Sequence, residues 1–123
     1  MYNMENKLDF LRQKGVDVDT AVENMMGEET YNEMLNDYYE SLMSDFNTLE
    51  GYKNNNDIEN YAILVHSMKS NARSFGFMKL GEVCYSHEME SKANNVSYIN
   101  DNFEELRNNV TEVYNMISEY KNL

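Results

Sequence analysis

Apolar residues recur at steps of three and four along most of the chain, which is the spacing of one face of an α-helix. The clearest series lie in residues 58–75 and 103–120, a third lies in 30–49, and a weaker one covers about 77–92. The first series consists of Ile58, Tyr61, Val65, Met68, Ala72 and Phe75. No segment shows sustained two-residue alternation, so no sheet is expected. The pattern predicts an all-α protein.

Small and polar residues mark where these helices are predicted to start and end. Gly27, Gly51 and Gly76 each follow an apolar series, which is typical of a residue that ends a helix. Asn56 precedes the series that starts at residue 58 and is predicted to cap that helix. Ser97 is the expected N-terminal cap of the last helix.

Short connections between long helices favour antiparallel neighbours. We therefore expect an antiparallel four-helix bundle over residues 28–123, preceded by one or two short additional helices over residues 1–27 that break near Gly15 and cap the bundle. With 123 residues there is room for one modest core, so residues 1–123 are expected to form a single domain. Because the apolar faces can cover one another within that bundle, we expect a monomer.

Composition narrows the function classes. The formal net charge is −12, which argues against binding to nucleic acid or anionic lipid, since both require basic surface. The apolar runs are too short to span a membrane, and the polar N-terminus lacks the apolar core of a signal peptide. A single cysteine, Cys84, excludes an internal disulfide framework. A cytoplasmic location is expected.

One stretch departs from this acidic background. Residues 61–81 contain Lys69, Arg73 and Lys79 and no carboxylate, and His66 lies among them. In a helix, His66 and Lys69 are neighbours on one surface because they are three residues apart. An imidazole beside a permanent positive charge is an arrangement that suits a phosphoryl acceptor.

The helical pattern also predicts which way His66 points. Each residue turns the helix by about 100°, so His66 lies well away from the centre of the apolar face and is expected to face solvent. Ser70, Arg73 and Ile63 fall on the same outward face, with Lys69 at its edge. We interpret Ile63, Ser70 and Arg73 as candidate partner-binding residues around an accessible histidine.

The surrounding residues resemble the motif of histidine-containing phosphotransfer (HPt) domains. The matching positions are His66, Ser67, Met68, Lys69 and Ser70, followed by Ala72, Phe75, Gly76 and Leu80. The resemblance implies that His66 accepts the phosphoryl group and that Lys69 stabilises the phosphate. It also implies that Gly76 ends the histidine-bearing helix and permits a tight turn.

Two positions depart from the family pattern. Ser70 stands where the family has a glycine that lets a partner approach closely, and His87 stands at a position where the family has a leucine. Neither departure affects the acceptor histidine or the lysine.

The function implied is that of a histidine phosphocarrier in a two-component phosphorelay, with a receiver domain or a hybrid sensor histidine kinase as partner. The chain has no glycine-rich phosphate loop and no evident carboxylate cluster next to His66, so we expect no kinase activity of its own. No cofactor is expected, because Mg²⁺ would belong to the partner receiver domain. The alternative is a helical adaptor that binds a receiver or kinase domain without being phosphorylated. A sensor-kinase dimerisation helix is disfavoured, because Ser67 rather than an acidic residue follows the histidine.

Cys84 and His87 have a spacing that would place two metal ligands one helical turn apart. Because a closed zinc site needs about four ligands, a core cysteine and a partly packed histidine are favoured, and no metal site is expected.

Overall fold

The structure, a computed structural model, describes residues 4–123. That part of the chain contains six helices and no strand, so the all-α prediction is confirmed. The helices are α1 (Met4–Gln13), α2 (Val18–Asn24), α3 (Glu28–Asn54), α4 (Ile58–Ser74), α5 (Met78–Lys92) and α6 (Val96–Lys121).

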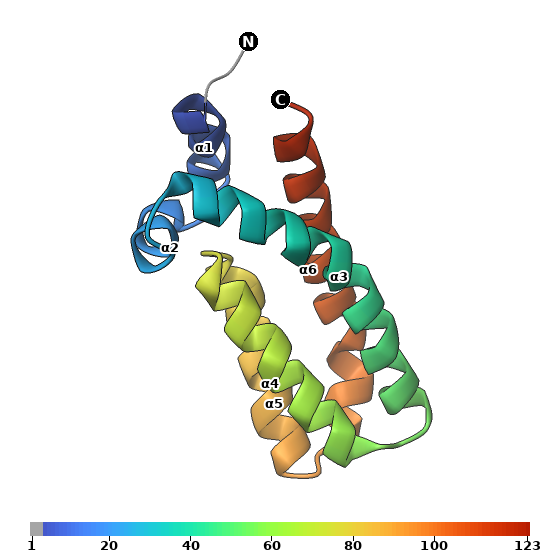
Figure 1. Ribbon diagram of the computed structural model, residues 1–123. Coiled ribbons are helices and arrows are strands. Elements are labelled where there is room, and N and C mark those ends of the chain that lie inside the picture. The colour runs from blue at the N-terminus through green and yellow to red at the C-terminus, as the bar shows by residue number, and fades with distance from the viewer. Residues whose placement is uncertain (1–3) are drawn as a thin grey trace.

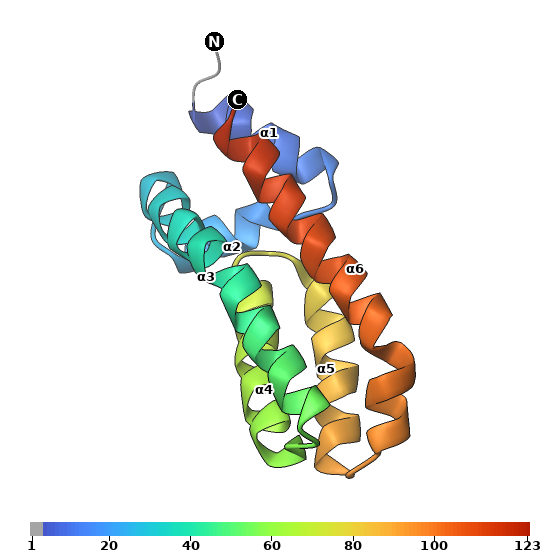
Figure 2. The same ribbon diagram turned by 90° about the vertical axis from the view of Figure 1, so that its right-hand side faces the viewer.

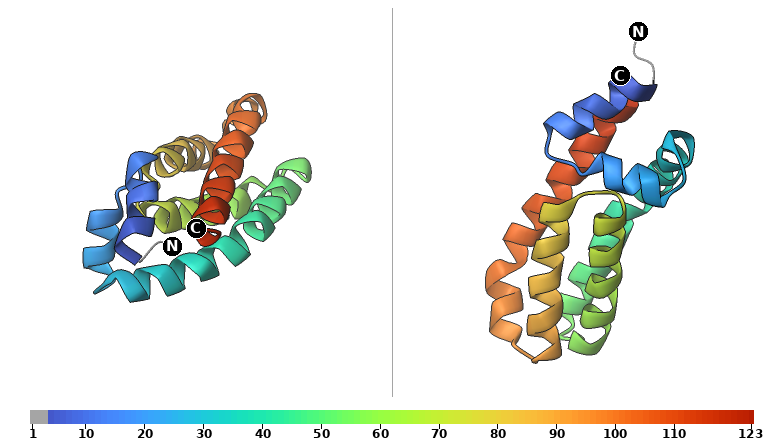
Figure 3. Two further views of the ribbon diagram at one scale, coloured as in Figure 1. Left: turned by 90° about the horizontal axis from the view of Figure 1, so that it is seen from above. Right: turned by 90° about the vertical axis from the view of Figure 1, so that its left-hand side faces the viewer.

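Helices α3 to α6 form an antiparallel four-helix bundle (Figure 1). Each packs against the next in chain order, and α6 returns to contact α3, which closes the bundle. Figure 2 shows α4, α5 and α6 running side by side over the lower part of the molecule. The two short helices lie at the opposite end, where α1 packs against α6 and α2 packs against α3 (Figure 3).

The core lies where the predicted apolar faces meet. Tyr61, Val65 and Ala72 of α4 are completely buried, as are Phe46 of α3 and Leu106 of α6. Fully burying one large apolar side chain stabilises a fold by about 1.5–3 kcal/mol, so these faces dominate the folding energy. The outward face of α4 is therefore oriented by packing on its other side.

The turn between α4 and α5 is held from outside by the start of α2. Gly76 follows the end of α4 with a φ of 91°, a conformation that favours glycine. Its carbonyl accepts a hydrogen bond from the Asp17 amide at 2.9 Å. A Cβ at Gly76 would lie 2.5 Å from the Asp17 carbonyl oxygen, so a side chain there would push the two segments apart.

Several boundary predictions were wrong, and asparagine explains part of the error. Gly51 lies inside α3, which continues to Asn54, and Gly27 is the N-cap of α3. Asn56 does not cap α4; it adopts a φ of 56° just after α3, a role that asparagine can share with glycine. The observed N-caps of α4 and α6 are Asp57 and Asn95, whose side chains accept hydrogen bonds from backbone N–H groups in the first turn of each helix. Ser97 therefore lies within the first turn of α6.

Candidate functional site

His66 lies near the middle of α4 and points outward, as the helical pattern predicted. Its side chain is 55% exposed, whereas the adjacent Val65 is completely buried. Ile63, one turn earlier, is also exposed, and so is Ser70, one turn later. The accessible face predicted around the histidine is therefore present.

A carboxylate from the neighbouring helix lies beside this histidine. Glu88 of α5 is only 2% exposed, and its Oε2 lies 2.7 Å from Nδ1 of His66. The other oxygen, Oε1, accepts a hydrogen bond from Nζ of Lys69 at 2.6 Å. Nζ of Lys92 approaches Oε2 at 2.7 Å. One buried carboxylate thus joins one imidazole and two ammonium groups.

Glu88 is ionised at neutral pH despite its burial. Burial by itself would raise its pKa, but the hydrogen bonds from Lys69, Lys92 and His66 outweigh that effect and lower the pKa to about 2. An ionised carboxylate can only accept hydrogen bonds. The proton of the neutral His66 ring is therefore placed on Nδ1, and Nε2 carries the free lone pair.

Lys69 is drawn inward by the same carboxylate. Its side chain is 13% exposed, and its Nζ lies 3.4 Å from Nδ1 of His66. Since both atoms carry protons in the tautomer that Glu88 selects, the short contact to Glu88 is the bond that holds Lys69. The lysine also lies over the ring of Tyr85, with Nζ 5.6 Å from the ring centroid.

Arg73 is less available than its position on the outward face suggested. Its guanidinium reaches across to α5, where it pairs with Glu82 at 3.3 Å and lies 5.5 Å from the centroid of the Tyr85 ring. Gly81 makes room for this side chain, because a Cβ there would lie 2.8 Å from Cγ of Arg73. Arg73 therefore contacts α5 and does not join the cluster at His66.

Glu88 and Lys92 were not recognised from the sequence as site residues. Residues 61–81 contain no carboxylate, so the stretch looked purely basic, but the fold places Glu88 against it from α5. A signal existed: Glu88 lies four residues after Cys84 and is therefore on the buried side of α5. An acidic residue at such a position requires a cationic partner.

The exposed face extends onto α5. Tyr85 and Met89 of α5 are 42% and 47% exposed, and Tyr85 lies beside Lys69 and Arg73 of α4. Ile63 on α4 and Tyr85 on α5 therefore leave exposed apolar surface on both of the helices that form the site. Single exposed apolar residues are common, but several around one reactive group suit a docking surface.

The second histidine has a different environment. His87 is completely buried; its Nδ1 lies 2.8 Å from the Tyr61 hydroxyl, and its Nε2 lies 3.2 Å from the Asn102 carbonyl. Because the carbonyl only accepts, Nε2 carries the proton, and the Tyr61 hydroxyl donates to Nδ1. Burial lowers the pKa of His87, so the ring is neutral.

Cys84 and His87 both lie in the core of the bundle. The thiol is buried, which raises its pKa to about 12, and both nitrogens of His87 already have hydrogen-bond partners. Over residues 4–123, no group of three or more histidine, cysteine or carboxylate side chains is placed to hold a metal ion.

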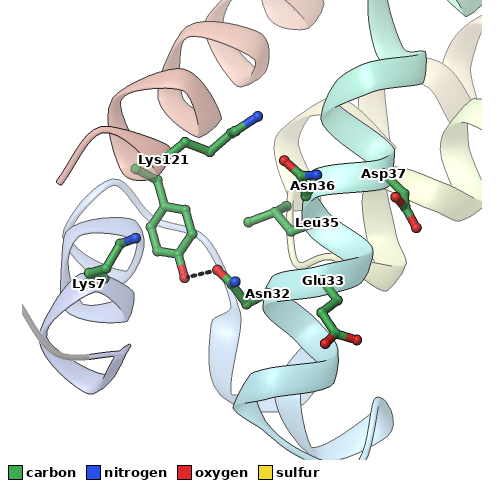
Figure 4. Close-up of a pocket in the computed structure, with 8 residues that line it drawn as sticks. Lys7, Asn32, Glu33, Leu35, Asn36, Asp37 and Lys121 are labelled. Carbon is green, nitrogen blue, oxygen red and sulfur yellow. Dashed lines mark hydrogen bonds between the residues drawn. The ribbon is translucent and has the colours of Figure 1, made fainter.

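The molecule also has a hollow at the end where α1, α3 and α6 meet (Figure 4). It has a volume of about 470 Å³ and is lined by both basic and acidic side chains, including Lys7, Lys121, Glu33 and Asp37. The Tyr120 hydroxyl donates a hydrogen bond to Asn32 at this place. No lining residue belongs to α4 or α5, so the hollow is separate from the site at His66.

The bundle and its exposed, carboxylate-paired histidine fit the class of protein that the motif indicated, a histidine-containing phosphotransfer domain. The model of the Hpt domain family matches residues 33–116, which is most of the chain. The protein belongs to the Hpt domain family. Such domains are phosphocarrier modules of phosphorelay signalling, and they interact with receiver domains and kinases.

No match was found among curated proteins or among solved structures. In the part of the chain that the structure describes, no helix combines the length and apolar character needed to cross a membrane.

Proposed function

We propose that this protein is a cytoplasmic histidine phosphocarrier that passes a phosphoryl group between Nε2 of His66 and the aspartate of receiver domains. The observation that carries the proposal is the contact between Nδ1 of His66 and the ionised Glu88. It occupies one ring nitrogen as a proton donor and leaves the other as a nucleophile on the exposed face. The motif around His66 and the family match support the same role.

The transfer step needs few groups from this chain. The lone pair of Nε2 attacks the phosphorus of an aspartyl phosphate in line, and the P–N bond forms as the bond to the aspartate oxygen breaks with its electron pair. The Nδ1 proton stays on the ring. Positive charge that develops on the imidazole is offset by Glu88, 2.7 Å away.

The lysines supply charge for the transferred group. Lys69 and Lys92 are held at the carboxylate that contacts Nδ1, and their side chains would turn toward Nε2 to reach the phosphoryl oxygens. Lysine suits this task as a flexible point charge. The chain itself needs no cofactor in this proposal, because Mg²⁺ and the acceptor aspartate belong to the receiver domain.

The partner would dock on the face formed by Ile63, Ser70, Tyr85 and Met89 around His66. The first two lie on α4 and the others on α5, so a receiver would contact both helices. Basic groups at this face suit an acidic receiver pocket, although the protein as a whole is acidic. We propose that the protein acts as a monomer and without kinase activity of its own.

Incubation with a panel of phosphorylated receiver domains tests the proposal. We expect acid-labile, alkali-stable label on the protein, and none on His66→Gln. Because His66 is more than half exposed, circular dichroism and thermal unfolding of that variant should match the unchanged protein. Label that persists in His66→Gln, or no label from any receiver, would defeat the proposal. Receiver binding without label would instead indicate the adaptor function.

A further inference from the structure

The Glu88 carboxylate lies next to His66, and its position has a consequence for the phosphorylated protein. This inference rests on the proposed function. Its Oε2 is shared between Nδ1 of His66 and Nζ of Lys92, each at 2.7 Å. With only 2% of the side chain exposed, the carboxylate has little access to water and depends on these partners. It therefore remains beside the ring when Nε2 carries a phosphoryl group.

The proton on Nδ1 determines how readily a phosphohistidine gives up its phosphoryl group. When the P–N bond breaks, its electron pair returns to Nε2. A ring that keeps the Nδ1 proton then leaves as neutral imidazole, whereas a ring without that proton must leave as an anion. The protonated form is the better donor, which is also why phosphohistidine is labile in acid.

We propose that Glu88 is a positioning residue that keeps Nδ1 of phosphorylated His66 protonated at neutral pH, so that the phosphohistidine is a ready donor rather than a long-lived store. The carboxylate would do so by accepting the Nδ1–H bond directly. An anion in contact with a protonated nitrogen stabilises the protonated form and raises its pKa.

Some of the charged groups around the His66 ring favour protonation of Nδ1, and others oppose it. On α4, the ammonium of Lys69 lies 3.4 Å from Nδ1 and opposes protonation. On α5, Lys92 weakens the effect of Glu88 by sharing Oε2, while the ring of Tyr85 lies beside Lys69. Among the residues that the structure describes, no ion pair or hydrogen bond joins α3 or α6 to His66.

The carboxylate is the charged group nearest to Nδ1, at 2.7 Å against 3.4 Å for Nζ of Lys69. The carboxylate contacts Nδ1 through a short hydrogen bond, whereas both ammonium groups are held by the carboxylate itself. Lys92 is 57% exposed and is free to turn toward phosphoryl oxygens.

The test uses phosphoramidate, a small donor that phosphorylates histidine without a partner protein; ammonia leaves as the P–N bond to His66 forms. Phosphorus NMR then follows the signal of the phosphohistidine against pH, and its decay at neutral pH gives the lifetime. Glu88→Gln keeps an oxygen that can accept from Nδ1–H and removes the charge. We expect the titration midpoint to fall by about one unit and the lifetime to lengthen about tenfold.

In a second variant, we expect the titration midpoint to shift in the opposite direction. Lys92→Ala removes a positive charge from the neighbourhood of the ring, so the midpoint should rise and the lifetime should shorten. Lys79→Ala is the matched control, because Lys79 is an exposed α5 lysine that pairs with Glu112 away from the site. It should leave both quantities unchanged.

The outcomes separate the two proposals. Phosphorylated protein whose midpoint and lifetime are the same in Glu88→Gln would overturn the role of Glu88 and leave the phosphocarrier intact. If Glu88→Gln does not fold, by circular dichroism, an unchanged or lowered midpoint in Lys92→Ala would overturn it instead. No phosphorylation of the unchanged protein, or equal phosphorylation of His66→Gln, would defeat the proposed function and this inference with it.

Discussion

The two histidines of this protein have the same side chain, yet the fold places them in opposite environments. His66 is 55% exposed and donates from Nδ1 to an ionised carboxylate, which leaves Nε2 without a partner in the described structure. His87 is completely buried, and both its nitrogens are engaged by neutral groups. A histidine can act as a nucleophile only when one of its ring nitrogens is exposed and has no hydrogen-bond partner.

Helix α5 serves both environments with adjacent residues. His87 points into the core toward Tyr61 of α4, while Glu88 turns toward the outer edge of α4 and contacts His66. Helix α5 therefore contributes to both the core and the site, in each case through a contact with α4. We expect core changes at His87 to lower stability, and changes at His66 to alter chemistry with little effect on folding.

The largest contrast should come from truncating each ring to alanine. His87→Ala leaves a cavity and removes the partners of the Tyr61 hydroxyl and the Asn102 carbonyl, so we expect a loss of about 2–4 kcal/mol in the free energy of unfolding. His66→Ala should lose less than about 1 kcal/mol, because the side chain is largely exposed and Glu88 keeps both lysines. Urea denaturation measures both. Equal losses would contradict the separation between core and site.

Acidification should expose a second difference. Because burial lowers the pKa of His87 below its ordinary 6.5, the unfolded chain binds more protons than the folded protein, and stability falls as the pH drops below 6.5. A further loss should follow between pH 4.5 and about 2, as Glu88 is protonated. His87→Leu should remove only the first of these losses. Urea denaturation at about pH 7.5, 5.5 and 3.5 measures the two steps.

If the first loss persists undiminished in His87→Leu, other groups cause it, and His87 is not held neutral by the fold. Comparison of the slope of stability against pH in the two proteins separates this effect from any overall change in stability.

The smallest predicted difference tests the hydrogen bond of the buried histidine. Tyr61→Phe leaves Nδ1 of His87 unpaired and should lower the free energy of unfolding by about 1–2 kcal/mol. Tyr38→Phe is the matched control, because its buried hydroxyl has no hydrogen-bond partner among the described residues. That change should be neutral or slightly stabilising. A loss in Tyr38→Phe as large as in Tyr61→Phe would show that the contact to His87 adds nothing specific.

Much of the fold could be predicted because the helices leave local signals. The apolar positions from Ile58 to Phe75 identified α4 and its buried face. Because His66 does not belong to that face, its exposure could be predicted as well. Helix ends were harder to predict, since Asn56 ends α3 in a conformation usually associated with glycine. The N-cap of α4 shifted by one residue as a result.

The sequence by itself determined the all-α class, the outward position of His66 and its nearness to Lys69, because these depend on residues three or four apart on one helix. Only the tertiary structure decided which ring nitrogen is free. That depends on Glu88, which lies 22 residues from His66 and reaches it only because α5 packs against α4. Helical periodicity specifies the face on which a side chain lies, whereas packing between helices specifies what lies opposite.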